Sequence, residues 1–356
     1  MAEARGGDPP EDVPGGIKGV LVRVDEFQQR RPVFAFPVAV IKKFGDDKAG
    51  KLAALLAYYG FFSLFPLLLV FVAVLGFVLA NNPDLHGEVV NSVFARFPFI
   101  GTQIRENVQS VRGSGAAVVV GLVVALWAGL GVMQGAQDAM NEVWGVPMKD
   151  RPNFLKSRLR SVIMLLILGV GIVLATLLAG VATAGKDRAL IIQAAALVIS
   201  LAVNFGLFLV AFRVLTVRNV SIGQLVPGAV LAAVGSLILQ SVGGYILGNK
   251  MADAGETYGD FATVIVLLTW LSLQAHLTLF AAEVNVVRAR RLWPRSLTQD
   301  PLAEADKEVL TQVAKVEERH PEQEIEVEFH DDGGEDDDEE PATGGEARTG
   351  SKTRAT

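Results

Sequence analysis

Six long apolar segments constrain the fold of this 356-residue chain more than any other feature of its sequence. The hydrocarbon core of a bilayer is about 30 Å thick, and a helix needs roughly 20 apolar residues to cross it. Lipid offers the backbone N–H and C=O groups no hydrogen-bond partners, so segments inside it must be helical. We therefore predict an all-α fold, a polytopic membrane helix bundle with six transmembrane helices. The six segments are residues 52–80, 116–140, 161–184, 189–215, 222–247 and 261–287.

The composition supports a membrane protein and argues against several other classes. Hydrophobic residues make up 51% of the chain and the mean hydropathy is +0.39, with the excess concentrated in the six segments. Much of the net charge of −6 comes from the acidic run at 331–340, so we expect no nucleic-acid partner. The chain has no cysteine and only four histidines, without an HExxH pattern. We therefore expect no metal site and no cofactor.

The regions outside the apolar segments differ in character. Residues 1–16 are rich in glycine, proline and acidic residues, and we expect them to be disordered, like the acidic tail at 331–356. Residues 17–51 are predicted to form cytoplasmic or interfacial amphipathic helices. Residues 288–330 form a predicted cytoplasmic extension with a short helix near 302–316. The first apolar segment exceeds the roughly 7–15 residues of a signal peptide and is interpreted as a permanent anchor.

The first of the amphipathic helices allows two interpretations. Its apolar residues recur at helical spacing, with charged residues between them: Ile17, Val20, Leu21, Val24 and Phe27. This pattern is typical of a helix that lies on a membrane surface. Packing of the same apolar face against the protein's own cytoplasmic side fits the pattern equally well.

The distribution of Lys and Arg predicts the orientation. Four flank the start of the first span, five follow the second, two follow the fourth and four follow the sixth. Only six lie on the opposite side. Because positive residues are enriched in cytoplasmic loops, both termini are expected in the cytoplasm. An even number of spans agrees with this orientation.

Polar residues inside apolar segments are costly and therefore call for a function or a partner. Gln134, Asp138 and Asn141 share one helical face near the end of the second span. Arg213 and Glu283 lie at a similar predicted depth in the fourth and sixth spans. We expect Arg213 to pair with Asp138, Glu283 or both, in an ionic cluster at the cytoplasmic mouth of the bundle. The alternative is that these residues only tie helices together or reach the interface.

The sixth span is the most polar, and Gln274 and His276 lie near its centre. A histidine titrates near neutral pH, so His276 could serve a proton relay. The alternative is a neutral histidine that is hydrogen-bonded to another helix.

Five motifs resemble those of one known family, the BrkB/YihY family of bacterial inner-membrane proteins. They are AYYGFFSLFPLLLVFVAVLGF from Ala57, AMNEVWGV from Ala139, LVPGAVLAA from Leu225, YGDFATVIVLLTWL from Tyr258 and AAEVN from Ala281. The resemblance covers about residues 34–291, and the Lys-Phe pair before Asp46 resembles the actinobacterial branch. Three positions depart from the family pattern: Thr216 replaces a common proline, Ala281 a usual glycine and Ser272 a common aromatic residue.

The resemblance implies six helices in the bacterial plasma membrane, and it implies no settled activity. Some members carry the label ribonuclease BN, and one branch is named for virulence through serum resistance. Hydrolysis of RNA needs a metal cluster or an acid/base pair together with a basic surface, and the sequence offers neither, so we expect no enzyme.

The favoured interpretation is a transporter or permease for a small solute or lipid. The candidate pathway residues are Gln134, Asp138, Asn141, Arg213, Gln274, His276 and Glu283. The alternative is a non-transporting membrane scaffold in envelope maintenance. Neither a substrate nor a coupling ion nor an oligomeric state follows from the sequence.

Overall fold

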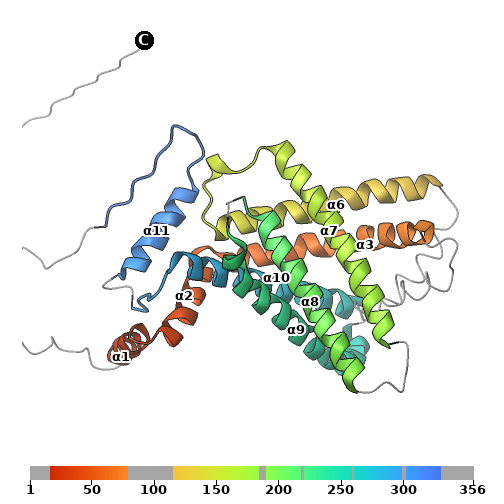
Figure 1. The fold of residues 1–356 in the computed structure, drawn as a ribbon, viewed down its shortest axis with the longest axis horizontal. Helices are drawn as coiled ribbons and strands as arrows, with labels where there is room; N and C mark the ends of the chain where they lie inside the picture. The colour runs from red at the N-terminus through yellow and green to blue at the C-terminus, as the bar shows by residue number, and fades with distance from the viewer. Residues whose placement is uncertain are drawn as a thin grey trace, which may run out of the picture. The chain divides into compact units, whose positions relative to one another are not determined.

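The computed structural model describes residues 17–78, 115–183, 190–217, 220–258, 260–298 and 302–329. Within these ranges the protein is helical and contains no strand, which confirms the predicted all-α class (Figure 1). The described helices belong to one compact unit, Met1–Glu326; of the second unit, Val327–Thr356, only residues 327–329 are described. The predicted disordered ends, 1–16 and 331–356, lie outside the described residues. The α-helices are α1 (Ile17–Gln29), α2 (Pro32–Asp46), α3 (Ala49–Val78), α6 (Gly115–Val143), α7 (Phe154–Thr183), α8 (Leu190–Leu215), α9 (Ile222–Tyr258), α10 (Asp260–Arg290) and α11 (Glu304–Val316).

Six of these helices, α3 and α6 to α10, have 26 to 37 residues each. At about 1.5 Å per residue, even the shortest is longer than the hydrocarbon core of a bilayer is thick. In the described part of the chain, three helices are long and apolar enough to cross a membrane: Leu197–Leu215, Ile222–Gly243 and Val264–Arg290. Some of the side chains of α3, α6 and α7 are not described by the structure.

Two of the helices continue well beyond the predicted apolar segments. Helix α7 begins at Phe154, so the basic run before residue 161 is already helical. Helix α9 continues past residue 247 to Tyr258. The apolar pattern marks where lipid would surround a helix. The helix itself continues wherever good helix formers such as alanine, lysine and glutamate follow.

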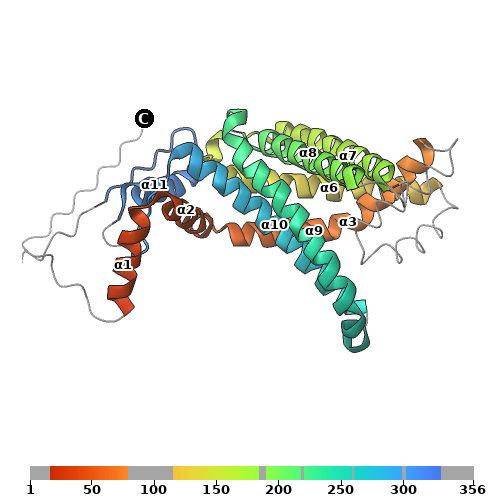
Figure 2. The same ribbon diagram turned by 60° about the horizontal axis from the view of Figure 1, so that its bottom comes forward.

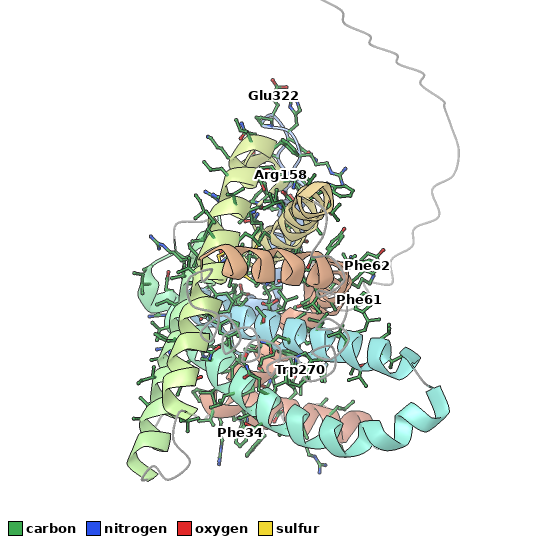
Figure 3. All side chains as sticks on the ribbon, turned by 90° about the vertical axis from the view of Figure 1, so that its right-hand side faces the viewer. Phe34, Phe61, Phe62, Arg158, Trp270 and Glu322 are labelled. Atoms are coloured by element: carbon green, nitrogen blue, oxygen red, sulfur yellow. The ribbon has the colours of Figure 1, made fainter. Side chains whose placement is uncertain are left out.

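The outer surface of the long helices is apolar. Trp127 of α6, Leu166 of α7 and Val198 of α8 are 73%, 64% and 64% exposed. Phe62 of α3 also lies on the outside of the helices (Figure 3). A water-soluble bundle turns such residues inward. An exterior of this kind is expected where lipid is the solvent.

Glycines allow α9 and α10 to pack closely. Gly228, Gly235 and Gly243 of α9 face α10 at intervals of seven and eight residues. A Cβ atom at any of them would lie within 3.0 Å of an atom of α10: the Ala281 carbonyl oxygen, the Leu277 side chain or the Trp270 ring, respectively. Small residues at helix interfaces of membrane proteins allow this close approach of two backbones. The position of α10 relative to α9 is thus fixed along most of the shared length.

Helix α1 exposes its apolar face and buries its polar one. Asp25 and Gln28 are 5% and 3% exposed, whereas Val20 is 59% and Phe27 is 49% exposed. The polar face is buried because Asp25 and Gln28 hydrogen-bond residues 295–298, which follow α10. Packing of the apolar face against the described part of the protein, one of the two alternatives, is therefore wrong.

The two ends of the described chain meet at one end of the bundle. Helices α1, α2 and α11 lie together there, beside the start of α3 and the end of α10 (Figure 2). Hydrogen bonds from α1 and α2 to residues 295–306 join parts of the chain that are more than 250 residues apart in sequence. We call this end the polar end of the bundle.

We predict that Gly228→Ala destabilises the protein and that Gly223→Ala does not. A Cβ at position 228 would strike the Ala281 backbone, which cannot rotate away, so overpacking should cost about 1–3 kcal/mol or more. A Cβ at position 223 of the same helix meets nothing within 4 Å. Thermal unfolding of the two detergent-purified variants measures the difference. Equal melting temperatures would contradict the close packing of α9 on α10.

Candidate functional site

A buried ionic cluster lies at the polar end of the bundle, formed by Lys43, Asp47 and Glu283. The Lys43 ammonium contacts the Asp47 carboxylate and lies 3.8 Å from Glu283 Oε2. It also donates a hydrogen bond of 3.3 Å to the Val143 carbonyl oxygen at the end of α6. Lys43 is 2%, Asp47 8% and Glu283 0% exposed. Helices α2, α6 and α10 thus meet at one ammonium group.

Local sequence explains how α2 and α10 bring these groups together. Lys43 and Asp47 are four residues apart, so the end of α2 presents them on one face. The same face of α2 carries the fully buried Ala35 and Ala39. On α10, Glu283 follows Ala281 and Ala282, which are also fully buried. Small side chains on both helices leave room for the lysine.

The cluster has two carboxyl groups for one ammonium group. Burial raises the pKa of Asp47 above its ordinary value, and this effect exceeds the opposing attraction of Lys43. The Asp47 and Glu283 carboxyl groups both face the Lys43 ammonium. Among the described residues, no N–H or O–H donor hydrogen-bonds either Glu283 oxygen. The cluster is therefore a buried acid pair held beside a lysine.

The predicted pairing of Arg213 with Asp138 or Glu283 is wrong. The Arg213 guanidinium donates to the carbonyl oxygen of Val220, in the connection between α8 and α9. The cation beside Glu283 is Lys43. Lys43 was not among the predicted site residues, because it precedes the first span and was used only to predict the orientation. Its i, i+4 spacing to Asp47 is the signal that could have drawn attention to it.

The three polar residues predicted to share one face of α6 have different surroundings. Gln134 donates to Ser157 Oγ on α7 at 2.8 Å, and Asn141 Oδ1 accepts from the Val217 N–H at 3.2 Å. Asp138 is exposed and takes no part in the ionic cluster. For Gln134 and Asn141, these contacts match the alternative that the polar residues tie helices together.

The polar residues of α10 also make helix contacts. Gln274 donates to Ser236 Oγ of α9 at 2.7 Å. His276 Nδ1 lies 2.8 Å from the Ser272 carbonyl oxygen in its own helix, so the predicted bond to another helix is wrong. Because a carbonyl only accepts, Nδ1 carries the proton. The ring also packs near Phe44 of α2, with 6.0 Å between ring centroids.

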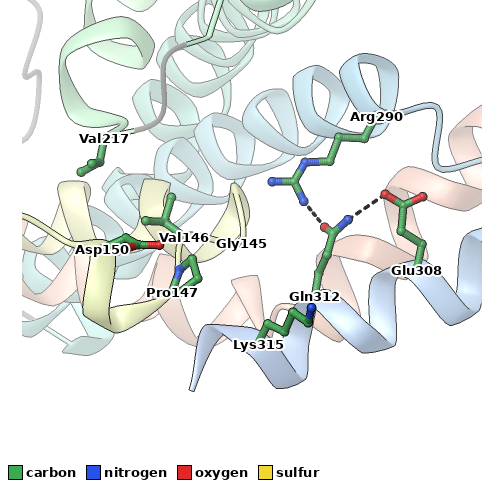
Figure 4. A pocket seen from close by; sticks show the side chains of 9 residues that line it. All are labelled: Gly145, Val146, Pro147, Asp150, Val217, Arg290, Glu308, Gln312 and Lys315. Carbon is green, nitrogen blue, oxygen red and sulfur yellow. Dashed lines mark hydrogen bonds between the residues drawn. The ribbon is translucent and has the colours of Figure 1, made fainter. Parts of the chain in front are cut away.

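A pocket of about 610 Å³ lies at the polar end, beside the connection that follows α6 (Figure 4). Helix α6 ends in a Schellman motif, in which the Val146 N–H bonds the Asn141 carbonyl and Gly145 has a φ of 57°. Arg290 donates to the Trp144 carbonyl and to Gln312 of α11. None of the predicted pathway residues lines this pocket. Its lining residues are Gly145, Val146, Pro147, Asp150, Val217, Arg290, Glu308, Gln312 and Lys315.

A second polar cluster, absent from the sequence predictions, joins the two ends of the chain. Arg295, 2% exposed, donates to Asp306 Oδ1 at 2.6 Å and to Asp46 Oδ2 at 2.8 Å. Asp25 accepts from the Ser296 hydroxyl and the Leu297 N–H, each at 2.9 Å. We call these residues the terminal polar cluster: Asp25, Gln28, Lys42, Asp46, Arg295, Ser296 and Asp306. It attaches α1 and α11 to the bundle.

Long helices with an apolar exterior and paired polar groups inside define a helical integral membrane protein. The chain belongs to the virulence factor BrkB family, whose model matches residues 40–306. This confirms the resemblance drawn from the five motifs.

Three relatives illustrate the family. The inner membrane protein YhjD of Escherichia coli strain K12 is 28% identical over 277 residues, 71% of this chain and 81% of that protein. An uncharacterised protein of Dickeya dadantii strain 3937 is 30% identical over 289 residues, 75% and 86% of the two chains. The putative ribonuclease-like protein YfkH of Bacillus subtilis strain 168 is 24% identical over 250 residues, 67% and 90% of the two. No solved structure matches this chain. The actinobacterial branch stays a prediction.

The terminal polar cluster should make stability depend on acidic pH. Burial alone would raise the pKa of Asp306, but the Ser296 N–H, Arg295 and Lys42 outweigh it and lower the pKa. Burial likewise opposes the bonds from Leu297, Gln28 and Ser296, which lower the pKa of Asp25. Both lowered values stabilise the protein above about pH 4, and this contribution is lost as pH falls through the folded-state pKa.

We therefore predict that Asp306→Asn lowers stability at pH 7 by about 3 kcal/mol, because it leaves Arg295 buried with one anion fewer. The variant should also lose part of the acid sensitivity of the native protein. Glu304→Gln, in the same turn of α11 but with its side chain 93% exposed, is the matched control. Thermal unfolding between pH 7 and about pH 2 checks both statements, because the contribution is lost only below about pH 4. An Asp306→Asn profile that matches the control would contradict them.

Proposed function

We propose that the protein is a multi-pass transporter or permease of the bacterial plasma membrane that moves a small solute or a lipid. The observation that carries this proposal is the buried Lys43–Asp47–Glu283 cluster between helices of an integral membrane protein. Ionisable groups inside membrane helices are costly, and they commonly mark a substrate or ion pathway. We place the inner end of the pathway at this cluster.

The proposed topology has six spans with both termini in the cytoplasm. It is supported by the lengths of α3 and α6 to α10 and by the contacts that bring α1 and α11 to the same end of the bundle. A chain whose two ends lie on the same side of a membrane must cross that membrane an even number of times. The excess of Lys and Arg residues near this end of the bundle supports its location on the cytoplasmic side of the membrane.

The second candidate function is a non-transporting scaffold in envelope maintenance. It is favoured by the hydrogen bonds that occupy predicted pathway residues: Gln134 bonds Ser157 of α7, and Gln274 bonds Ser236 of α9. Side chains that tie helices together are not free to bind a moving solute. In this case Glu283 and Lys43 would serve only to fasten α2 to the bundle.

We further infer that the protein is not a ribonuclease, although one relative is named ribonuclease-like. A metal-dependent nuclease needs several clustered ligands. In the described ranges, no three His, Cys, Asp or Glu side chains come together in a way that could hold a metal ion. The carboxyl groups of the ionic cluster are buried and so are closed to a polymer such as RNA.

We predict that purified protein in proteoliposomes moves a small solute or lipid and that Glu283→Gln reduces the rate at least tenfold. The probes are a dithionite-quenchable fluorescent phosphatidylglycerol and a radiolabelled mixture of amino acids, sugars and carboxylic acids. Glu317→Gln, with a side chain 59% exposed, is the control and should move the probe at the native rate. A native protein that moves neither probe faster than empty vesicles would favour the scaffold.

A further inference from the structure

We propose that Asp47 and Glu283 share one exchangeable proton. With this proton bound, the pair carries one negative charge, which the positive charge of Lys43 neutralises. The geometry of the two carboxyl groups is the first argument. Two ionised carboxylates repel and have no hydrogen to share, whereas a carboxylic acid donates a hydrogen bond to a carboxylate. The side chains of Asp47 and Glu283 are brought together at one group, since the Lys43 ammonium contacts Asp47 and lies 3.8 Å from Glu283 Oε2.

The charge of the cluster is the second argument. One ammonium and two carboxylates leave one unpaired negative charge at a place where the three side chains are at most 4% exposed. Two further carboxylates act on the acid pair, Asp46 on α2 and Glu142 on α6. Each is already paired with an arginine, Asp46 with Arg295 and Glu142 with Arg151, so neither pair adds a positive charge to the cluster. A buried, uncompensated charge is strongly unfavourable, and binding one proton removes it.

The contacts of Lys43 indicate which oxygen atoms hold the proton. Its ammonium already binds the Asp47 carboxylate and the Val143 carbonyl, whereas Glu283 Oε2 lies 3.8 Å away, beyond a hydrogen bond. Asp47 therefore keeps the negative charge beside the lysine, and Glu283 carries the proton and donates it to Asp47. Asp46, next to Asp47 in the sequence, has a side chain that is 26% exposed and is paired with Arg295.

This proton would be the coupling ion of the transport proposed above, and only this last step depends on the proposed function. Loss of the proton would leave Glu283 charged, buried and without a hydrogen-bond donor. The contact between α2 and α10 would then weaken. A helix contact that depends on one proton can link proton movement to opening of a pathway.

Infrared difference spectroscopy of the purified full-length protein in lipid tests the proposal directly. We expect a carbonyl stretching band of a buried carboxylic acid at pH 7 that shifts in D₂O and disappears at high pH. The band should be lost in Glu283→Gln and kept in the control Glu317→Gln. A native spectrum without the band, or a band unchanged in Glu283→Gln, would overturn the proposal.

Stability gives a second measurement that needs no transport. The two carboxyl groups share the proton and therefore titrate as a pair, and burial raises the pKa of Asp47. The stability that the bound proton provides is thus present at low pH and is lost as pH rises through the folded-state pKa. Glu283→Gln keeps a donor toward Asp47 at every pH, so its melting temperature should fall less than that of the native protein as pH rises through the folded-state pKa. Equal falls would contradict the shared proton. A normal band and normal stability without transport would refute only the proposed function.

We also infer, from a different observation, that α1 and the start of α2 lie on an anionic lipid surface. The exposed apolar residues of α1 continue onto α2, where Val33 is 78% and Phe34 is 48% exposed. Phe34 points away from the helix bundle (Figure 3), and its ring centroid lies 5.7 Å from that of Phe27. The strip is defined by Val20, Leu21, Val24, Phe27, Val33 and Phe34.

Charge complementarity identifies the lipid. Arg23, Arg30 and Arg31 are exposed around the strip against a single exposed acid, Glu26. The Arg31 guanidinium lies over the Phe27 ring, 4.7 Å from its centroid. An apolar strip bordered by arginines suits the boundary between acyl chains and anionic headgroups. The buried polar face of α1 holds the helix in this orientation.

The absence of cysteine from the sequence allows single-cysteine labelling of the full chain. A fluorophore at Val24→Cys should be quenched by shallow nitroxide lipids in vesicles that contain phosphatidylglycerol, more than one at Glu26→Cys on the same helix. Replacement of the three arginines by glutamine should reduce the quenching. Equal quenching at both positions would contradict the inference. So would protection of Val24→Cys that depends on protein concentration and not on lipid, because a second copy would then cover the strip.

Discussion

The rest of the structure depends on the lack of hydrogen-bond partners in lipid. The described helices expose large apolar side chains, so the polar groups between them must find partners inside the bundle. Gln137 shows the consequence: it is 1% exposed and bonds both the Ser157 carbonyl and the Ser161 hydroxyl of α7. Gln274 and Ser236 do the same between α10 and α9. The first role of these buried polar side chains is therefore to hold neighbouring helices together.

The ionic cluster follows the same rule with one exception. The Lys43 ammonium bonds the Asp47 carboxylate and the carbonyl oxygen at the end of α6. Glu283, in contrast, accepts no hydrogen bond from the described residues and lies beside a second carboxyl group. A purely structural contact would be better served by one carboxylate, because the second adds a desolvation cost and a like charge. This excess acid separates Glu283 from the hydrogen-bonded glutamines and makes it the centre of the proposed function.

Helices α1, α2 and α11, near the two ends of the described chain, are packed into the bundle. Helix α2 supplies Lys43 and Asp47, and Arg295 and Asp306 attach the region after α10 to α1 and α2. The arrangement also explains why α1 has its polar face inward: the polar partners lie inside, and the apolar side remains for lipid.

The sequence by itself determined the helical class, the membrane environment, the family and the ends of several helices. These depend on local apolar length and on short motifs, and α8 and α11 begin and end within a few residues of the predicted positions. Only the tertiary structure decided the partners of the charged residues. Arg213 and Glu283 lie at similar predicted depths, yet Arg213 bonds Val220 and Glu283 faces Lys43, about 240 residues away in the sequence. Depth along a helix can be read from hydropathy, whereas the direction in which a side chain points across the bundle depends on how the glycine-lined helices pack.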